Sequence, residues 1–162
     1  MVWVRHTDPQ LSWVNARFKS ESDSGLVFLT DDGQEFSVPK SEQKSVLIAS
    51  HSSINSVVDN LVSLEEFNAG AILHQLRKRY NQDAIYTWIG SILVSINPFK
   101  ALPIYTSTVL QEFMALQDLT KASPHVYALA AAAYRDMSLD REAQAFVISG
   151  EVRFSVNQTH CA

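Results

Sequence analysis

The sequence predicts a mixed α+β protein in which a small β-barrel precedes a region of helices and strands. Short alternating apolar runs with turn signals between them fill residues 1–51, a pattern typical of strands. Residues 57–140 instead combine apolar positions at helical spacing with two short strand-like runs. The polar stretch "SHSSINS", residues 50–56, separates the two zones and is the best linker candidate.

Composition and charge exclude several classes of protein. The chain has 162 residues, enough for one domain or for a small module with part of a larger one, and 46% hydrophobic residues are typical of a folded protein. A net charge of -4 gives no support for nucleic-acid binding. There is no signal-peptide pattern, and no apolar run has the length of a membrane span. Cys161 is the single cysteine, so no internal disulfide is possible, and we expect a reducing, cytoplasmic compartment.

The first zone, residues 1–51, contains the runs "VWVRH", "WVNARFKSE", "GLVFLTD" and "EFSVPK". The pair Asp32-Gly33 between the last two runs is a strong hairpin signal. Strands this short and this close together predict a small barrel in the style of an SH3 domain. Trp3 and Trp13 are interpreted as packing residues of that barrel, although exposed aromatic side chains on such a module could bind a peptide from a protein partner.

The second zone opens on a predicted helix over residues 63–80. Ser63 is placed as its N-cap, and Glu66, three residues later, completes a capping box. The basic residues 77–79 fall in the last turn, where cations complement the helix dipole. We interpret this basic trio as a solvated helix end rather than as a binding patch.

Further strands and helices follow. Two apolar runs, Ile85–Ile89 and Ile92–Ile96, predict strands that flank Gly90-Ser91. The runs "STVLQEFMALQ" and "PHVYALAAAAYRDM" predict two more helices, the second preceded by a proline. A last apolar run, Phe146–Ser149, predicts a buried strand that ends at Gly150.

A strand that ends in Gly150-Glu151 can be compared with the phosphate-binding P-loop, G-x-x-x-x-G-K-[ST]. Counted from Gly150, the second Gly, the Lys and the Ser or Thr fall on Ser155, Val156 and Asn157. Each of these positions departs from the pattern, so spacing alone indicates an ordinary strand end.

The segment "NPFKALPIY", Asn97–Tyr105, is the second candidate site. Asn-Pro after an apolar strand is most often a turn. An Asn amide and a Tyr ring could also recognise the edge and the face of a purine. The five histidines show no metal-ligand spacing with the cysteine or with acidic residues, and no catalytic arrangement of side chains is indicated.

Together, these segments resemble one family, the myosin motor head, over about residues 1–151. The stretch from "VDNLVSLEEFNAGAILHQLRKRY" through "NPFKALPIY" is similar to the start of a myosin motor. "PHVYALAAAAYRDM" is similar to the helix before the P-loop strand, and "REAQAFVISGE" to that strand, which in myosins continues G-E-S-G-A-G-K-T. "VWVRHTDPQLSWVNARF" is similar to the SH3-like subdomain that many myosins carry. The resemblance implies an SH3-like barrel over residues 1–51 and an incomplete P-loop NTPase α/β domain over residues 57–151.

The resemblance also implies a nucleotide site. In myosins the Asn-Pro loop and its downstream Tyr border the adenine pocket, which carries over to Asn97, Pro98, Phe99, Lys100 and Tyr105. Ala101 departs from the larger residue that many myosins have there. Of the family's P-loop residues, only the first two have counterparts in this chain, namely Gly150 and Glu151. The intact family uses ATP with Mg²⁺ and binds the actin filament, so the resemblance implies a cytoskeletal place of action.

The resemblance implies that this chain is inactive as an enzyme. The P-loop Lys and Thr, the switch loops and the actin-binding regions would follow Glu151 in the family, and the sequence contains none of them. We therefore predict no ATPase activity and no stably bound ATP. The strand Phe146–Ser149 would lack neighbouring strands and expose apolar edges. An alternative is a non-enzymatic interaction fragment that uses the SH3-like module.

The tail, residues 152–162, matches no expected continuation of a motor. Val152-Arg153 is the dipeptide that read-through into an intron beginning GTAAG would encode. We interpret the tail as translated intron and expect it to be disordered. The genomic sequence after the Glu151 codon tests this interpretation.

Overall fold

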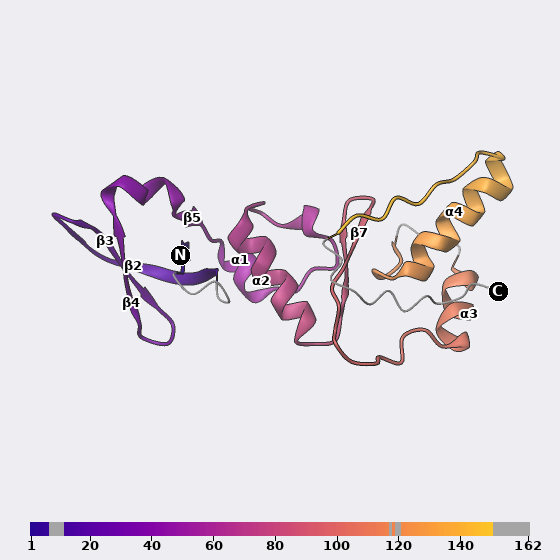
Figure 1. The fold of residues 1–162 in the computed structure, drawn as a ribbon, viewed down its shortest axis with the longest axis horizontal. Coiled ribbons are helices and arrows are strands. Elements are labelled where there is room, and N and C mark those ends of the chain that lie inside the picture. Colours follow the sequence, from indigo (N-terminus) through magenta and orange to yellow (C-terminus); the bar gives the residue numbers. More distant parts are fainter. Residues whose placement is uncertain (7–11, 117, 119–120, 151–162) are drawn as a thin grey trace.

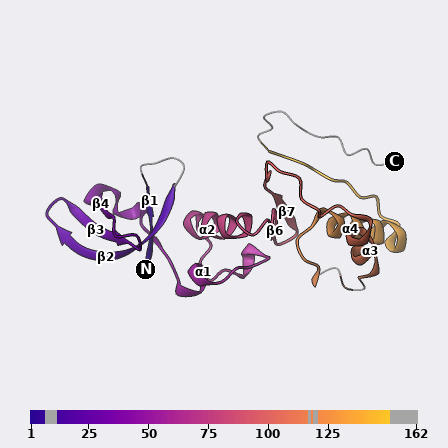
Figure 2. The same cartoon turned by 90° about the horizontal axis from the view of Figure 1, so that it is seen from below.

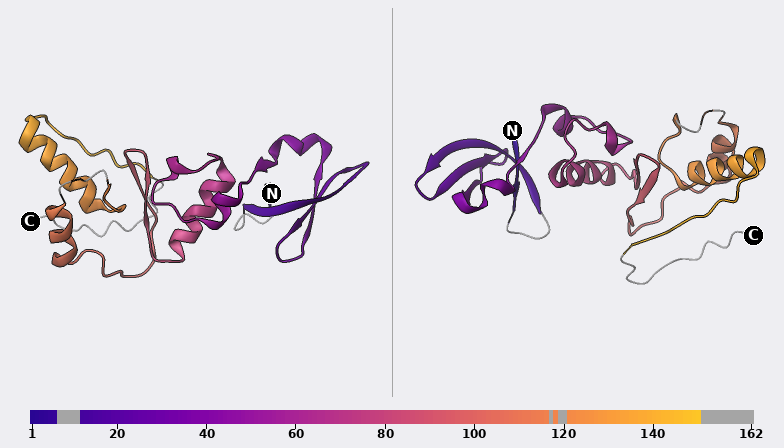
Figure 3. Two further views of the ribbon diagram at one scale, coloured as in Figure 1. Left: turned by 180° about the vertical axis from the view of Figure 1, so that it is seen from behind. Right: turned by 90° about the horizontal axis from the view of Figure 1, so that it is seen from above.

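The computed structural model describes residues 1–6, 12–116, 118 and 121–150. It has a mixed α+β architecture whose elements follow one another along an extended molecule (Figure 1). A five-stranded sheet lies at one end, helices α1 and α2 and the hairpin β6–β7 occupy the middle, and α3 and α4 lie at the other end, as the turned views in Figures 2 and 3 also show.

The N-terminal sheet contains β1 (Val2–Arg5), β2 (Trp13–Ser22), β3 (Gly25–Thr30), β4 (Glu35–Pro39) and β5 (Leu47–Ile48), with the 3-10 helix η1 (Lys40–Ser45) before β5. The strand order is β4-β3-β2-β1-β5, and all pairs are antiparallel. Gly33 adopts a φ of 83° between β3 and β4, so the hairpin predicted at Asp32-Gly33 is confirmed. One buried apolar cluster within the sheet consists of Val4, Ala16, Phe28 and Val38.

Trp3 joins the sheet to helix α2 (Ala69–Tyr80). Successive side chains of a strand point to opposite faces, so Trp3 and its neighbour Val4 enter different clusters. A Cβ atom added at Gly70 would lie 2.3 Å from Trp3 Cγ, which shows how closely the indole lies on the α2 backbone. Trp3 is 1% exposed and Trp13 packs against the same cluster. Both tryptophans are therefore packing residues, but they pack between the sheet and α2 rather than inside the predicted barrel.

The predicted linker is a helix. Residues His51–Asn55 form α1, and the Ser50 side chain caps it by accepting from the Ser53 N–H. The fully buried Gln75 of α2 donates from Nε2 to the Ser53 and Ser56 carbonyls, at 2.7 and 2.9 Å. The linker prediction is wrong because α2 supplies partners for the backbone of this polar stretch.

Helix α2 begins later than the sequence predicts. Its N-cap is Asn68, whose Oδ1 accepts from the Ala71 N–H at 3.0 Å. Ser63 instead ends a separate 3-10 turn, η2 (Leu61–Ser63). Glu66 accepts from the Ser50 N–H at 2.7 Å, so the capping box is wrong. Burial tends to raise the pKa of Glu66, but hydrogen bonds from Ser50 hold that pKa below its usual value.

The C-terminal half contains the hairpin β6 (Tyr86–Ile89) and β7 (Ile92–Ser95), then α3 (Ser107–Ala115) and α4 (Val126–Asp140). The two predicted strands and the two predicted helices are thus confirmed, with no end displaced by more than three residues. A third buried cluster joins α3 to α4 and consists of Phe113, Ala122 and Ala128. Within the part of the chain that the structure describes, no helix is long and apolar enough to cross a membrane.

Residues 141–150 form no strand, although Phe146–Ser149 was predicted to be one. The segment runs back from the end of α4 in an extended course (Figures 1 and 2). Val147 and Ile148 are 92% and 94% exposed. A strand needs a hydrogen-bonded neighbour, and none of the described strands pairs with this segment. The predicted exposure of its apolar side chains is confirmed, whereas the tail beyond it lies outside the described residues.

Candidate functional site

The predicted base-binding loop, residues 97–105, connects β7 to α3 and is held by turn chemistry at its start. Asn97 Oδ1 accepts a 2.8 Å hydrogen bond from the Phe99 N–H, which closes an Asx turn. Phe99 adopts a φ of 52°, in the left-handed region, and its side chain is 87% exposed. The side-chain amide oxygen of Asn97 therefore fixes the first turn of the loop, and the Phe99 ring is exposed to solvent.

Two contacts hold the middle of the loop to the end of α2. Lys100 Nζ lies 2.6 Å from Asp83 Oδ1, in an ion pair with both side chains about half exposed. Tyr80 Oη donates to the Pro98 carbonyl at 3.3 Å. The loop is thus attached to the element that precedes the hairpin as well as to the hairpin itself.

Tyr105, at the end of the loop, is attached to β6 through its hydroxyl. Tyr105 Oη lies 2.7 Å from Tyr86 Oη, while the Tyr105 side chain remains 48% exposed. Tyr127 Oη on α4 donates to the Tyr105 carbonyl at 3.2 Å. Burial, followed by the hydrogen bond with Tyr105, raises the pKa of the Tyr86 hydroxyl. The Tyr86 hydroxyl therefore stays protonated, and its hydrogen bond fixes one edge of the Tyr105 ring.

His125 lies at the centre of the aromatic cluster behind the loop. Its ring stacks on Phe113 at a centroid distance of 4.9 Å and an interplanar angle of 20°. The Tyr86, Tyr105 and Tyr127 rings lie 5.2, 5.7 and 4.7 Å from it. Sequence reasoning missed this role because histidines were compared only with metal-ligand spacings. The available signal was the position of His125 between a proline and a strong helix former, where an N-cap is expected.

Arg79 supports the site from α2. Its guanidinium donates from Nε to Thr87 Oγ1 at 2.9 Å, from Nη2 to the Tyr86 carbonyl at 2.8 Å and from Nη1 to the Val58 carbonyl at 3.1 Å. Arg79 is 6% exposed, so the predicted solvated helix end is wrong at this residue. A planar guanidinium satisfies several fixed acceptors at once, which explains its use in a buried position.

Gly150, the first of the predicted phosphate-binding residues, has open surroundings. A Cβ atom added there would meet no described residue within 4 Å. Glu151 lies outside the described residues. Among the residues described, no group of three or more His, Cys, Asp and Glu side chains is placed to hold a metal ion.

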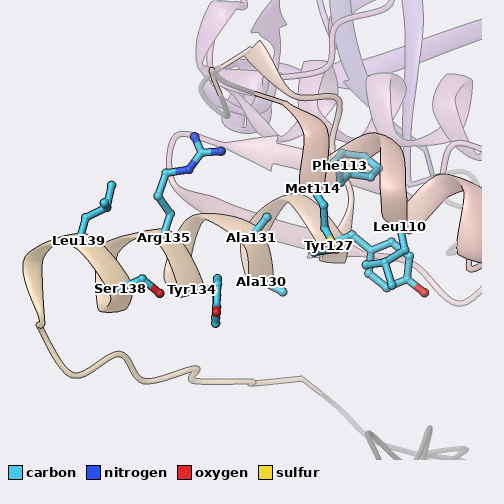
Figure 4. A pocket seen from close by; sticks show the side chains of 10 residues that line it. All are labelled: Leu110, Phe113, Met114, Tyr127, Ala130, Ala131, Tyr134, Arg135, Ser138 and Leu139. Carbon is cyan, nitrogen blue, oxygen red and sulfur yellow. The ribbon is translucent and has the colours of Figure 1, made fainter.

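A groove of about 530 Å³ lies between α3 and α4. Figure 4 shows that its lining side chains come from these two helices. The groove shares Phe113 and Tyr127 with the aromatic cluster, but residues 97–105 do not line it. It is mostly apolar, with Arg135 and the hydroxyls of Ser138, Tyr127 and Tyr134 as its polar groups.

Comparison with known proteins decides the family. Residues 58–153 match the family model "Myosin head (motor domain)". The chain belongs to the myosin head family. The myosin match begins just after α1 and covers the loop 97–105, the aromatic cluster and Gly150.

Individual myosins are similar over most of the chain. The high molecular weight form of myosin-1 from Acanthamoeba castellanii is 38% identical over 93% of this chain, and the Myosin-H heavy chain from Dictyostelium discoideum is 35% identical over 93%. Unconventional myosin-IXAa from Danio rerio is 46% identical over 57%. The chain spans 9%, 8% and 4% of the lengths of these three relatives. Because only about a tenth of the chain at most lies outside these two matches, they include at least most of the N-terminal sheet, which precedes the family match.

Proposed function

We propose that this myosin head segment belongs to an actin-based, ATP-driven motor and that residues 97–105 border the adenine base of ATP. The observation that carries the proposal is the state of Tyr105: its hydroxyl is fixed by Tyr86 while about half of its side chain stays exposed. A ring that is held at its edge and open on its surface suits stacking on a purine. The actin filament is the partner that the family implies, and the cytoskeleton the place of action.

The residues present fit the base better than the phosphates. The loop offers the side-chain amide of Asn97 and the exposed aromatic rings of Phe99 and Tyr105. ATP with Mg²⁺ would also need groups that surround its phosphates and hold the metal. Gly150 and Glu151 are proposed only as the first residues of a P-loop, since the open surroundings of Gly150 supply no such groups.

We further propose that the 162-residue chain has no ATPase activity of its own. Phosphoryl transfer depends on positioned cations around the γ-phosphate. Ser155, Val156 and Asn157 occupy the positions at which the P-loop pattern has Gly, Lys and Ser or Thr. No step of hydrolysis can therefore be assigned to side chains of this chain.

The N-terminal sheet, within residues 1–51, is proposed to be an SH3-like barrel. Five short antiparallel strands around an apolar cluster support this assignment. We propose that residues 57–151 form the second domain, the N-terminal part of a myosin motor domain. The alternative function, peptide binding by the barrel, receives less support because Trp3 and Trp13 pack towards α2.

Titration of the full chain with ADP and ATP tests the base site. We expect weak but saturable binding at millimolar nucleotide, seen as a change in the fluorescence of Trp88, which packs against the cluster beneath the loop. Y105F keeps the ring but loses the hydroxyl that Tyr86 holds, so it should bind more weakly, whereas Y105A should lose binding. F18A removes another exposed aromatic side chain, on β2, and serves as the matched control. No response at millimolar nucleotide, or equal binding by Y105A, would contradict the proposal.

A further inference from the structure

His125 connects three elements through the two nitrogens and the face of one buried ring. It is the N-cap residue of α4, and its Nδ1 accepts a 3.0 Å hydrogen bond from the Tyr127 N–H. Its Nε2 lies 3.0 Å from the Ile104 carbonyl oxygen, at the end of the loop 97–105. The ring also stacks on Phe113 of α3. One imidazole thus links the loop, the start of α4 and α3.

These two contacts allow a single protonation state. A backbone N–H can only donate, so Nδ1 must carry a lone pair where it meets Tyr127. A carbonyl oxygen can only accept, so Nε2 must carry the proton where it meets Ile104. The structure therefore requires neutral His125 in the Nε2–H form.

We propose that neutral His125 is the positioning residue that holds Ile104–Tyr105 against the first turn of α4. Protonation at Nδ1 breaks the hydrogen bond from the Tyr127 N–H while Nε2–H still donates to the Ile104 carbonyl, so the loop and the ring together separate from the start of α4, Tyr105 is released and base binding weakens. The link to base binding rests on the proposed function above. The positioning itself does not, because it follows from the contacts of the ring.

Protonation is unfavourable for three physical reasons that act together. A proton on Nδ1 would face the Tyr127 N–H, so the α4 cap would be lost. The positive charge would lie in a buried site and at a helix N-terminus, where the helix dipole opposes it. The titratable groups that face the ring are phenols rather than carboxylates: Tyr86 on β6, Tyr105 on the loop and Tyr127 on α4.

The pKa of His125 agrees with this arrangement. Burial lowers the pKa of the imidazole, and the hydrogen bond to the Ile104 carbonyl opposes that shift in part. Phe113 on α3 supplies packing without charge. A release of the loop is therefore expected only below the ordinary histidine pKa of 6.5.

Nuclear magnetic resonance of the ¹⁵N-labelled full chain tests the positioning directly. Long-range ¹H–¹⁵N spectra above the histidine pKa should show the Nε2–H form of His125. On acidification, the Tyr127 amide and the Tyr105 ring should shift with the midpoint of the His125 ring, below pH 6.5. The Nδ1–H form, or Tyr105 and Tyr127 signals that do not follow His125, would overturn the proposal.

Variants separate positioning from general packing. H125F keeps an aromatic ring but removes both nitrogens, and H125N supplies an oxygen that can cap α4 without reaching Ile104. The pH dependence of the Tyr105 signals should vanish in both and persist in H51F, a control on an exposed histidine of α1. If H125F does not fold, H125N still decides, because persistence of the pH dependence in it contradicts the role of His125.

ADP titrations at two pH values distinguish this proposal from the proposed function. One pH unit below the His125 pKa, roughly a tenth of the molecules keep the neutral ring, so the Kd for ADP should rise about tenfold in the native chain and stay constant in H125N. If ADP does not bind at either pH value but the nuclear magnetic resonance spectra of His125, Tyr105 and Tyr127 behave as expected, the base site is refuted. The positioning role of His125 is then still supported. Equal affinity at both pH values, with His125 protonated at the lower one, overturns the link between them.

Discussion

Arg79 Nε donates a 2.9 Å hydrogen bond to Thr87 Oγ1, and this contact ties the last turn of α2 to β6. Both side chains are buried. The same guanidinium binds the carbonyl of Tyr86, whose hydroxyl holds Tyr105. The position of the candidate base-binding ring therefore depends on a basic residue of a preceding helix.

Replacement of Arg79 by Lys should destabilise the fold although it keeps the charge. A lysine cannot satisfy the three acceptors that Arg79 reaches from one plane, so we expect a loss of about 2 kcal/mol in the free energy of unfolding. Urea unfolding followed by circular dichroism measures it. D59N is the control, because the Asp59 side chain is largely exposed and its ion pair with Arg79 should contribute at most about 1 kcal/mol. An R79K chain as stable as the native one would show that these bonds are dispensable.

Substitution at the two candidate N-caps should distinguish Asn68 from Ser63. N68A removes the oxygen that caps α2 and should cost about 1 kcal/mol in the free energy of unfolding. S63A removes an exposed hydroxyl from a 3-10 turn and should change stability by less than about 0.5 kcal/mol. The reverse order of the two effects would restore the capping box at Ser63 and Glu66. Urea unfolding of both variants decides between them.

G70A should be destabilising even though alanine favours helices. The new Cβ would approach Trp3 Cγ to 2.3 Å and Trp3 Cβ to 2.5 Å, and these atoms lie next to the backbone of β1. The resulting strain should exceed the gain in helix propensity and lower the unfolding free energy by about 1–3 kcal/mol. G150A is the control, because a Cβ there meets open space. Thermal unfolding should show a lower Tm for G70A and an unchanged Tm for G150A.

Acidification should destabilise the packing between α2 and α1 through His74. Burial, and then the charges of Lys78 and Arg77, lower the pKa of His74, whereas its hydrogen bond with the Ile54 carbonyl opposes the shift. Because the folded-state pKa lies below the unfolded value of 6.5, the unfolded chain binds more protons in this range. The stability is thus complete above about pH 6.5 and is lost as the pH falls towards the folded-state pKa.

Unfolding free energies measured above and below pH 6.5 check this prediction. H74Q retains a donor for Ile54 but does not titrate, so its stability should fall less on acidification. H51Q, at an exposed position on α1, should behave as the native chain does. A native chain whose stability rises on acidification would contradict the sign of the effect. His125 contributes in the same direction, since burial lowers its pKa as well.

Elements set by local chemistry could be predicted from the sequence. The hairpin predicted at Asp32-Gly33 and the two strands predicted to flank Gly90-Ser91 are confirmed. The motif Asn97–Tyr105 was recognised by its residues, and the family match covers it. The Asx turn of Asn97 follows from adjacent residues alone.

The start of α2 and the fate of residues 50–56 could not be predicted in this way. Glu66 had an attractive local partner in Ser63, but the Ser50 N–H, 16 residues away, takes its carboxylate. The polar stretch became α1 because Gln75 satisfies its carbonyls from another helix. Such choices depend on groups that are distant in the sequence.

The sequence by itself determined the family, the hairpins and the identity of the loop 97–105, because turn residues and apolar periodicity act between near neighbours. Only the tertiary structure decided that Arg79 is buried, that Trp3 packs on Gly70 and that His125 caps α4 beneath Tyr105. The physical reason is that burial and hydrogen-bond partners are properties of assembled elements. A lone arginine or histidine looks the same in a sequence whether water or a carbonyl oxygen completes its hydrogen bonds.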